Sequence, residues 1–160
     1  MGERNAIGEA APNPFFETWD TPFGMPPFER IETAHFAPAF DEGIARQRRE
    51  VEAIATHAGA PTFENTVAAL DASGGLLDRI GGVFFNLTAA ETSEALQDVA
   101  RTVAPRLTAL QDDILLDPRL FARVRAVWER RDALGLDAEQ LRLVEETYKT
   151  FVRGGANLEA

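Results

Sequence analysis

Apolar residues recur at helical spacing along the chain, and the densest pattern covers Thr62 to Ala90. Two apolar stripes run through this segment. One contains Phe63, Val67, Leu70, Leu77 and Phe84, and the other contains Leu76, Ile80, Val83 and Leu87. Apolar residues at this spacing share one face of a helix, so two stripes predict a helix that is apolar on more than one face. We therefore expect residues 62–90 to form the central helix of a bundle.

Four glycines interrupt this predicted central helix. They are Gly74, Gly75, Gly81 and Gly82. Each interior glycine destabilises a helix by about 1 kcal/mol relative to alanine. We expect that this cost is offset because the glycines allow the backbone of a neighbouring helix to approach closely.

Four further segments carry single apolar stripes and predict helices. Residues that favour helix amino termini open them, namely Thr33, Ser93, Asp117 and Asp137, and Thr62 is the predicted cap of the central helix. Gln140 completes a predicted capping box with Asp137. Pro105 lies inside the helix that follows Ser93 and is expected to kink it, because proline lacks the N–H donor. The polar face of the first helix, with Arg46, Arg48, Arg49, Glu50 and Glu52, is expected to be solvated.

The first thirty residues differ from the rest of the chain. They contain five prolines that oppose helix formation, together with apolar anchors at Phe15, Phe16, Trp19, Phe23, Met25 and Phe28. We expect an extended arm over 1–30 that packs by its aromatic side chains on a helical domain over 31–160. The predicted fold class is all-α, a bundle of about five helices preceded by this arm.

Composition narrows the function classes. The formal net charge of −10 opposes binding to nucleic acids or to anionic membrane surfaces, and the chain contains no cysteine for disulfides or thiolate metal sites. No apolar run approaches the length of a membrane span, and the amino terminus lacks the apolar middle of a signal peptide. A cytoplasmic location is the expectation, with the periplasm as the alternative if a signal peptide precedes Met1 in the gene.

Two histidines are the first candidates for metal chemistry. His35 and His57 are too far apart in sequence for the His-Glu-x-x-His pattern of zinc hydrolases. Glu32 and His35 form one Glu-x-x-His motif, but carboxylate-bridged di-iron bundles need two such motifs and two further glutamates. We expect His35 to be a surface or hydrogen-bonded histidine near a helix start.

Other candidates are equally incomplete. The adjacent carboxylates Asp112–Asp113 and Glu145–Glu146 point to different sides of their helices and cannot converge on one substrate. The glycines between Gly74 and Gly82 lack the Lys-Ser/Thr of a phosphate loop, and Asn86–Thr88 is a glycosylation pattern inside a predicted helix. We therefore expect no catalytic, cofactor-binding or metal-binding residue in this chain.

An ordered set of short segments nevertheless resembles a known family. The segments are Asn-Pro-Phe-Phe at 13–16, Pro-Pro-Phe-Glu-Arg-Ile at 26–31, His-Phe-Ala-Pro-Ala-Phe at 35–40, Pro-Thr-Phe-Glu-Asn-Thr at 61–66, Phe-Phe-Asn-Leu at 84–87, Ala-Pro-Arg-Leu at 104–107 and Phe-Val-Arg-Gly-Gly-Ala at 151–156. Together they resemble the N-terminal part of the oligopeptidase A, peptidyl-dipeptidase and thimet oligopeptidase family of zinc metallopeptidases. The set covers nearly the whole chain in the family's order.

The resemblance implies a function that this chain does not perform alone. Members of the family are helical clamshells with a deep channel, and their zinc ligands and catalytic glutamate lie on a His-Glu-x-x-His helix in the C-terminal part. None of those residues maps onto this sequence. The resemblance implies a non-catalytic channel wall or lid, partnered by the C-terminal catalytic part, in a parent enzyme that binds zinc and cleaves short peptides.

A second interpretation stays open. The chain is then a stand-alone helical module that binds peptides or partner proteins without catalysis. In either case, apolar helix faces that a parent enzyme would cover are expected to make the isolated chain self-associate.

Overall fold

The computed structural model describes residues 12–90 and 93–157. Its α-helices are α1 (Thr33–Ala55), α2 (Ala69–Ala72), α3 (Gly75–Ala90), α4 (Glu94–Leu115), α5 (Pro118–Arg130) and α6 (Ala138–Arg153). A π-helix, Phe63–Ala68, precedes α2, and short 3-10 turns occupy Pro14–Phe16, Pro22–Gly24, Phe28–Arg30 and Arg131–Ala133. Because the described ranges contain helices and no strands, the predicted all-α bundle with a preceding arm is confirmed. No described helix is long and apolar enough to cross a membrane.

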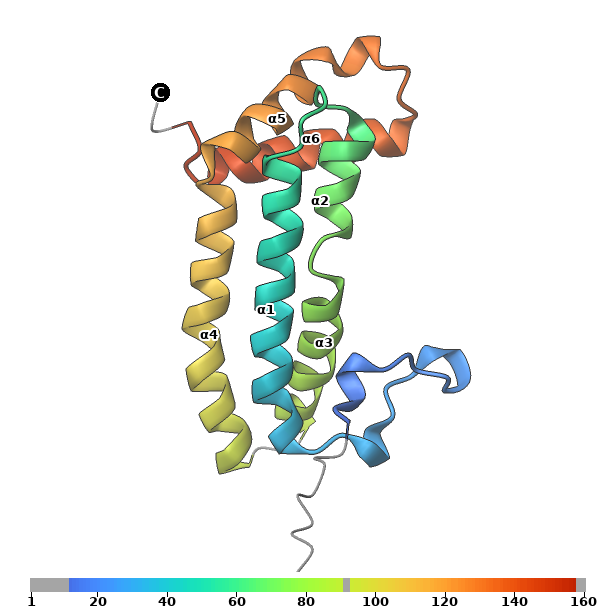
Figure 1. Cartoon of the computed structure of the whole chain (residues 1–160), viewed down its shortest axis with the longest axis vertical. Coiled ribbons are helices and arrows are strands. Elements are labelled where there is room, and N and C mark those ends of the chain that lie inside the picture. Colours follow the sequence, from blue (N-terminus) through green and yellow to red (C-terminus); the bar gives the residue numbers. More distant parts are fainter. Residues whose placement is uncertain (1–11, 91–92, 158–160) are drawn as a thin grey trace, which may run out of the picture.

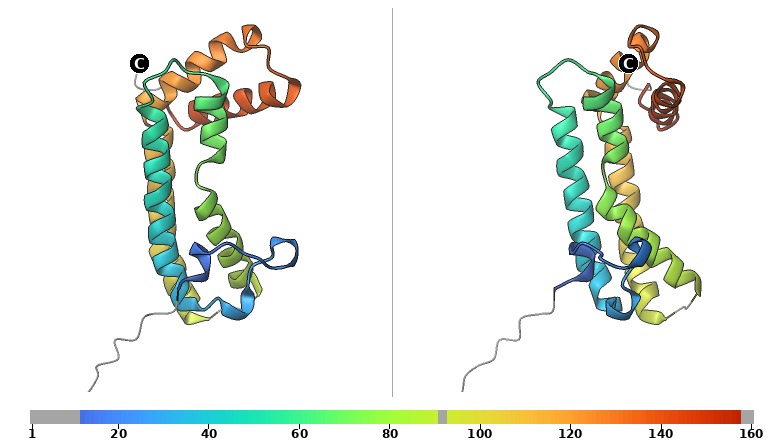
Figure 2. Two further views of the ribbon diagram at one scale, coloured as in Figure 1. Left: turned by 45° about the vertical axis from the view of Figure 1, so that its right-hand side comes forward. Right: turned by 90° about the vertical axis from the view of Figure 1, so that its right-hand side faces the viewer.

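Three long helices define the body of the molecule. α1 lies between α3 and α4 and contacts both of them (Figure 1). α5 and α6 pack on each other and run across one end of these long helices, whereas the arm lies beside α3 at the other end. A turned view shows α6 and the arm extending beyond the long helices on the same side (Figure 2).

The core follows the predicted stripes. Buried phenylalanines from the arm, α1 and α3 form a contiguous cluster, in which Phe84 contacts Phe36 and Phe40 with ring centroids 5.0 and 5.3 Å apart. Edge-to-face pairs at this separation stabilise a core beyond the area they bury. A second cluster joins α1, α5 and α6, and a third joins the π-helix to α5 and α6.

Local cap chemistry sets most of the helix boundaries. Thr62, Ser93, Asp117 and Asp137 accept backbone N–H bonds at the predicted amino termini, which confirms these four caps. The fifth prediction is wrong, because Thr33 is the first helical residue and Glu32 is the cap. α4 runs through Pro105 as one continuous helix.

The prediction of one continuous helix over 62–90 is also wrong. The chain breaks after α2, where Ser73 is extended with ψ of 149° and Gly74 has φ of +79°. The Glu50 carboxylate accepts a 2.8 Å hydrogen bond from the Gly74 N–H, and a Cβ on Gly74 would lie 2.6 Å from Nε2 of Gln47. Gly74 therefore provides a left-handed turn held by α1, since only glycine adopts this conformation without a steric cost.

The close helix contact lies at a glycine of α1 and not at those of α3. A Cβ on Gly43 would lie 3.0 Å from Cδ1 of Leu77 and 3.4 Å from its Cα. A Cβ on Gly75 or Gly82 would meet no described atom within 4 Å. The predicted role of the α3 glycines in packing is therefore wrong within the described chain.

The arm is anchored at one end. Phe15 is fully buried beside Phe36, the Arg79 guanidinium lies 4.7 Å from the Trp19 ring, and Arg79 donates to the Phe15 carbonyl. The remaining predicted anchors are exposed, namely Phe16, Phe23, Met25 and Phe28. The arm thus attaches through two of the six predicted apolar anchors, Phe15 and Trp19. Residues 1–11 of the predicted arm lie outside the described residues, and the division at residues 30 and 31 stays a prediction.

Candidate interaction surface

The two histidines serve the backbone. His35 Nδ1 accepts a 2.9 Å hydrogen bond from the Glu32 N–H, and the Glu32 side chain accepts one from the His35 backbone. Glu-x-x-His is therefore a capping box at the start of α1, which confirms the expectation of a hydrogen-bonded histidine near a helix start. His57 Nδ1 accepts a 3.0 Å bond from the Gly59 N–H. Within the described ranges, no group of three or more histidine, aspartate and glutamate residues is placed to hold a metal ion.

The remaining sequence candidates have separate structural surroundings. Asp113 forms an ion pair of 2.7 Å with Arg48, and Glu145 forms one of 2.6 Å with Lys149. Asn86 lies in α3 and donates to the carbonyl of Gly82. The structure therefore brings none of these candidates together. That the chain has no catalytic, cofactor or metal residue stays a prediction.

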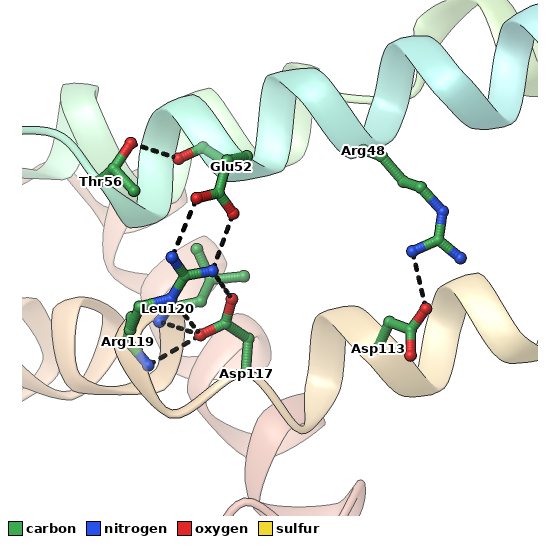
Figure 3. A network of polar contacts seen from close by, with 7 residues as sticks. All are labelled: Arg48, Glu52, Thr56, Asp113, Asp117, Arg119 and Leu120. Atoms are coloured by element: carbon green, nitrogen blue, oxygen red, sulfur yellow. Dashed lines mark hydrogen bonds and ion pairs between the residues drawn. The ribbon is translucent and has the colours of Figure 1, made fainter.

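A polar network joins the carboxyl end of α1 to the start of α5 (Figure 3). Arg119 donates to both carboxylate oxygens of Glu52 at 2.9 and 2.8 Å, and also to Asp117. Asp117 in turn accepts from the backbone N–H groups of Arg119 and Leu120, so it caps α5. The Arg119 guanidinium is the main cause that lowers the pKa of Glu52 and of Asp117, and these two carboxylates raise the pKa of Arg119. The network fixes α5 relative to α1.

A buried arginine holds the connection between α1 and the π-helix. Arg123 of α5 donates to the carbonyls of His57 and Gly59 at 3.0 and 3.1 Å and to Oδ1 of Asn65 at 3.0 Å. The sequence analysis did not identify Arg123, because only the apolar residues of this helix were assigned to its buried face. It also missed the use of Glu50, Glu52 and Arg48 in contacts between segments, since these residues were expected to form a solvated face.

An apolar groove between α3 and α4 is the main candidate for binding. We define the α3–α4 groove by its apolar lining, which surrounds about 380 Å³ and consists of Phe40, Leu77, Gly81, Gly82, Phe85, Leu107 and Leu110. Gln47, Asp78 and Gln111 also line it. The ring of Phe85 is about half exposed, at 56%. Apolar side chains exposed along a groove are typical of surfaces that bind another polypeptide.

The other exposed large apolar residues lie at the two ends of the molecule. Phe16, Phe23, Met25 and Phe28 belong to the arm, and Leu116 follows α4. Phe23 is fully exposed and has a positive φ of 60°, which is uncommon for a bulky residue. Exposed apolar side chains therefore lie at both ends of the molecule as well as in the α3–α4 groove.

Comparison with known proteins identifies relatives that are much longer than this chain. No protein-family model matches it. The chain is 48% identical over 146 residues to dipeptidyl carboxypeptidase of Salmonella typhimurium and 47% identical over 146 residues to that of Escherichia coli K12. Each match covers 91% of the chain but only 22% and 21% of the relative, respectively.

A more distant relative extends this match. Oligopeptidase A of Escherichia coli K12 is 24% identical over 138 residues, which are 86% of the chain and 20% of the relative. The chain thus spans about a fifth of the length of these relatives. By these similarities, the chain belongs to the dipeptidyl carboxypeptidase and oligopeptidase A family and corresponds to the N-terminal part of its longer members.

Proposed function

We propose that this chain is the non-catalytic N-terminal helical domain of a zinc-dependent peptidase that hydrolyses short peptides. The observation that supports this proposal is the difference in coverage, since the match takes in 91% of the chain and 22% of the relative. A segment that corresponds to about a fifth of a peptidase would form one structural part of the longer enzyme. Its partner is then the C-terminal catalytic part of the same polypeptide.

Within residues 12–90 and 93–157, the two histidines do not fit a zinc site. His35 lies near the start of α1 and His57 just after its end. At a rise of 1.5 Å per residue, the 22 steps from His35 to His57 span about 33 Å, so the two imidazoles cannot share one metal ion. Both Nδ1 atoms also accept backbone hydrogen bonds. Zinc and its activated water would be supplied by the other part of the enzyme.

The contribution of this chain is shape. α1 is held against α3 by the Gly43 contact, against α4 by the Arg48–Asp113 pair and against α5 by the Arg119–Glu52 pair. Such a body can act as a wall or lid that narrows access to a channel. Short unfolded peptides then enter and folded proteins do not. We place this enzyme in the cytoplasm, with the periplasm as the alternative.

A chimera tests this function directly. The aligned segment of the Salmonella relative is replaced by this chain, and hydrolysis of quenched fluorescent peptides is measured beside the unmodified relative and a version that lacks the segment. We expect the deletion to abolish activity and the chimera to retain it. A chimera that is soluble and fully helical but inactive would contradict the proposal.

A stand-alone binding module is the alternative, and the half-exposed Phe85 in its groove favours that reading. The gene distinguishes the two. A reading frame that continues past Ala160 to a His-Glu-x-x-His helix supports the peptidase domain, whereas a stop codon there supports the separate module.

A further inference from the structure

Two hollows lie next to each other along α4, the α3–α4 groove and a second one of about 260 Å³, and both are lined by Gln47 and Gln111. Near α5, Phe151 of α6 packs with Leu70 and Ile114 between α2 and α4. Phe151 and three further residues of α6 line this second hollow, whereas no described residue of α5 or α6 lines the α3–α4 groove. α6 therefore borders the second hollow, and no described helix beyond α1, α3 and α4 borders the α3–α4 groove.

The floor of the α3–α4 groove contains two glycines that no contact among the described residues requires. Gly81 and Gly82 are absent from the glycines with positive φ, so alanine fits their backbone conformation. A Cβ on Gly82 would meet no described atom within 4 Å, and one on Gly81 would meet only Phe85, at 3.7 Å. Glycine inside a helix is nevertheless destabilising relative to alanine. A helix surface without side-chain atoms allows the backbone of another segment to pack closely against it.

We propose that an α-helix from outside residues 1–160 of the same polypeptide packs in the α3–α4 groove, directly on Gly81 and Gly82. The proposal rests on the proposed function. The relatives hold nearly four-fifths of their length outside the matched segment, so ample chain is available to supply the helix. Its contact face would carry small and apolar residues towards the glycines, Phe85 and Leu107. Polar or basic residues would face Gln47, Asp78 and Gln111.

Charge disfavours a second copy as the occupant. Each copy carries a formal net charge of −10, and Asp78 lies on the groove itself. Two such surfaces repel each other at low ionic strength. The self-association expected of the isolated chain would therefore be weak and would strengthen with salt.

Cysteine labelling tests the occupant, because this chain contains no cysteine. Gly82→Cys places a thiol on the groove floor, and Ala109→Cys places one on an exposed part of α4 that does not line the groove. Modification by a maleimide is followed by mass spectrometry in the isolated chain and in the chimera described above. In the isolated chain, we expect both thiols to react at similar rates. In the chimera, the thiol of Gly82→Cys should react at least about tenfold more slowly, while that of Ala109→Cys is unchanged.

The outcomes separate this inference from the proposed function. Equal reactivity of the groove thiol in both proteins would overturn the helix proposal, even where the chimera is an active peptidase. Slow reaction in the isolated chain at high concentration, relieved by dilution, would identify a second copy as the occupant and also overturn it. Slow reaction there that dilution does not relieve would identify residues 1–11 as the occupant, with the same consequence.

A second variant guards against a thiol that perturbs the fold. Gly82→Leu should leave the melting temperature of the isolated chain unchanged or higher, because the groove has room for the side chain and leucine favours helix. In the chimera the same leucine should lower the melting temperature, since it occupies the space of the proposed helix. An equal or higher melting temperature in the chimera would contradict the inference.

Discussion

Arg119 and Glu52 meet through two hydrogen bonds of 2.9 and 2.8 Å, although 67 positions separate them in the sequence. The same guanidinium binds Asp117, which caps α5. One side chain thus couples the end of α1 to the beginning of α5. Because the side chains of Arg119 and Glu52 are both about half exposed, their coupling positions the helices more than it stabilises the fold.

The network around Arg119 predicts how the stability of the fold depends on pH. The pKa of Asp117 is held below its usual 3.8, chiefly by the hydrogen bond from Arg119. A lowered pKa in the folded state stabilises the protein above the usual pKa, and this contribution is lost as the pH falls through the folded value. Asp117→Asn keeps a capping side chain but removes the charge. We expect its melting temperature to fall less steeply than that of the wild type below about pH 4.

The measurement is the melting temperature by circular dichroism between about pH 2 and pH 6. Asp112→Asn is the matched control, because that carboxylate makes no hydrogen bond to Arg119. Parallel curves for the wild type and Asp117→Asn would show that Arg119 does not hold Asp117 in the charged form.

The capping box of α1 predicts a graded response at His35. Replacing His35 by alanine removes the acceptor for the Glu32 N–H and should destabilise the chain by about 1 kcal/mol. His35→Gln should cost less, because glutamine is the usual acceptor at this position of a capping box. Urea unfolding of the three proteins gives the free energies. If alanine and glutamine cost the same, the histidine ring has another role.

Sequence reasoning succeeded where the physical cause is local. Helix caps depend on a side chain and a backbone N–H two or three residues away, so Ser93 and Asp137 could be recognised from their neighbours alone. Thr33 was misread because the adjacent Glu32 competes for the same role through His35. The apolar stripes likewise located most of the core, since periodicity records which face is buried.

Features that depend on distant residues were not predictable in this way. The break at Gly74 is held by Gln47 and Glu50 of α1, which lie more than twenty residues earlier. Arg123 binds a connection more than fifty residues away. No pattern within one segment carries such information. The candidate groove was foreseen only in part, as apolar character on more than one face of α3.

Alanine substitutions at two glycines of residues 62–90 should change the free energy of unfolding in opposite directions. Gly74→Ala should destabilise the chain by about 1–2 kcal/mol, because alanine is strained at φ of +79° and its Cβ would collide with Gln47. Gly82→Ala should stabilise the isolated chain by up to about 1 kcal/mol, since it removes backbone freedom without meeting any described atom. Chemical denaturation distinguishes the two signs. If Gly74→Ala stabilised the chain, the break at Gly74 would be contradicted, and residues 62–90 would form the continuous helix that the sequence predicts.

Adjacent phenylalanines provide the sharpest test of the α3 orientation. Phe84 is 1% exposed at the centre of the aromatic cluster, so Phe84→Ala should cost about 3–5 kcal/mol. Phe85 points into the α3–α4 groove, and Phe85→Ala should cost less than about 1 kcal/mol in the isolated chain. The two variants differ by one position and remove the same atoms, which makes each the control of the other. A similar loss of stability for both would mean that α3 is rotated and that its exposed face is not the groove described above.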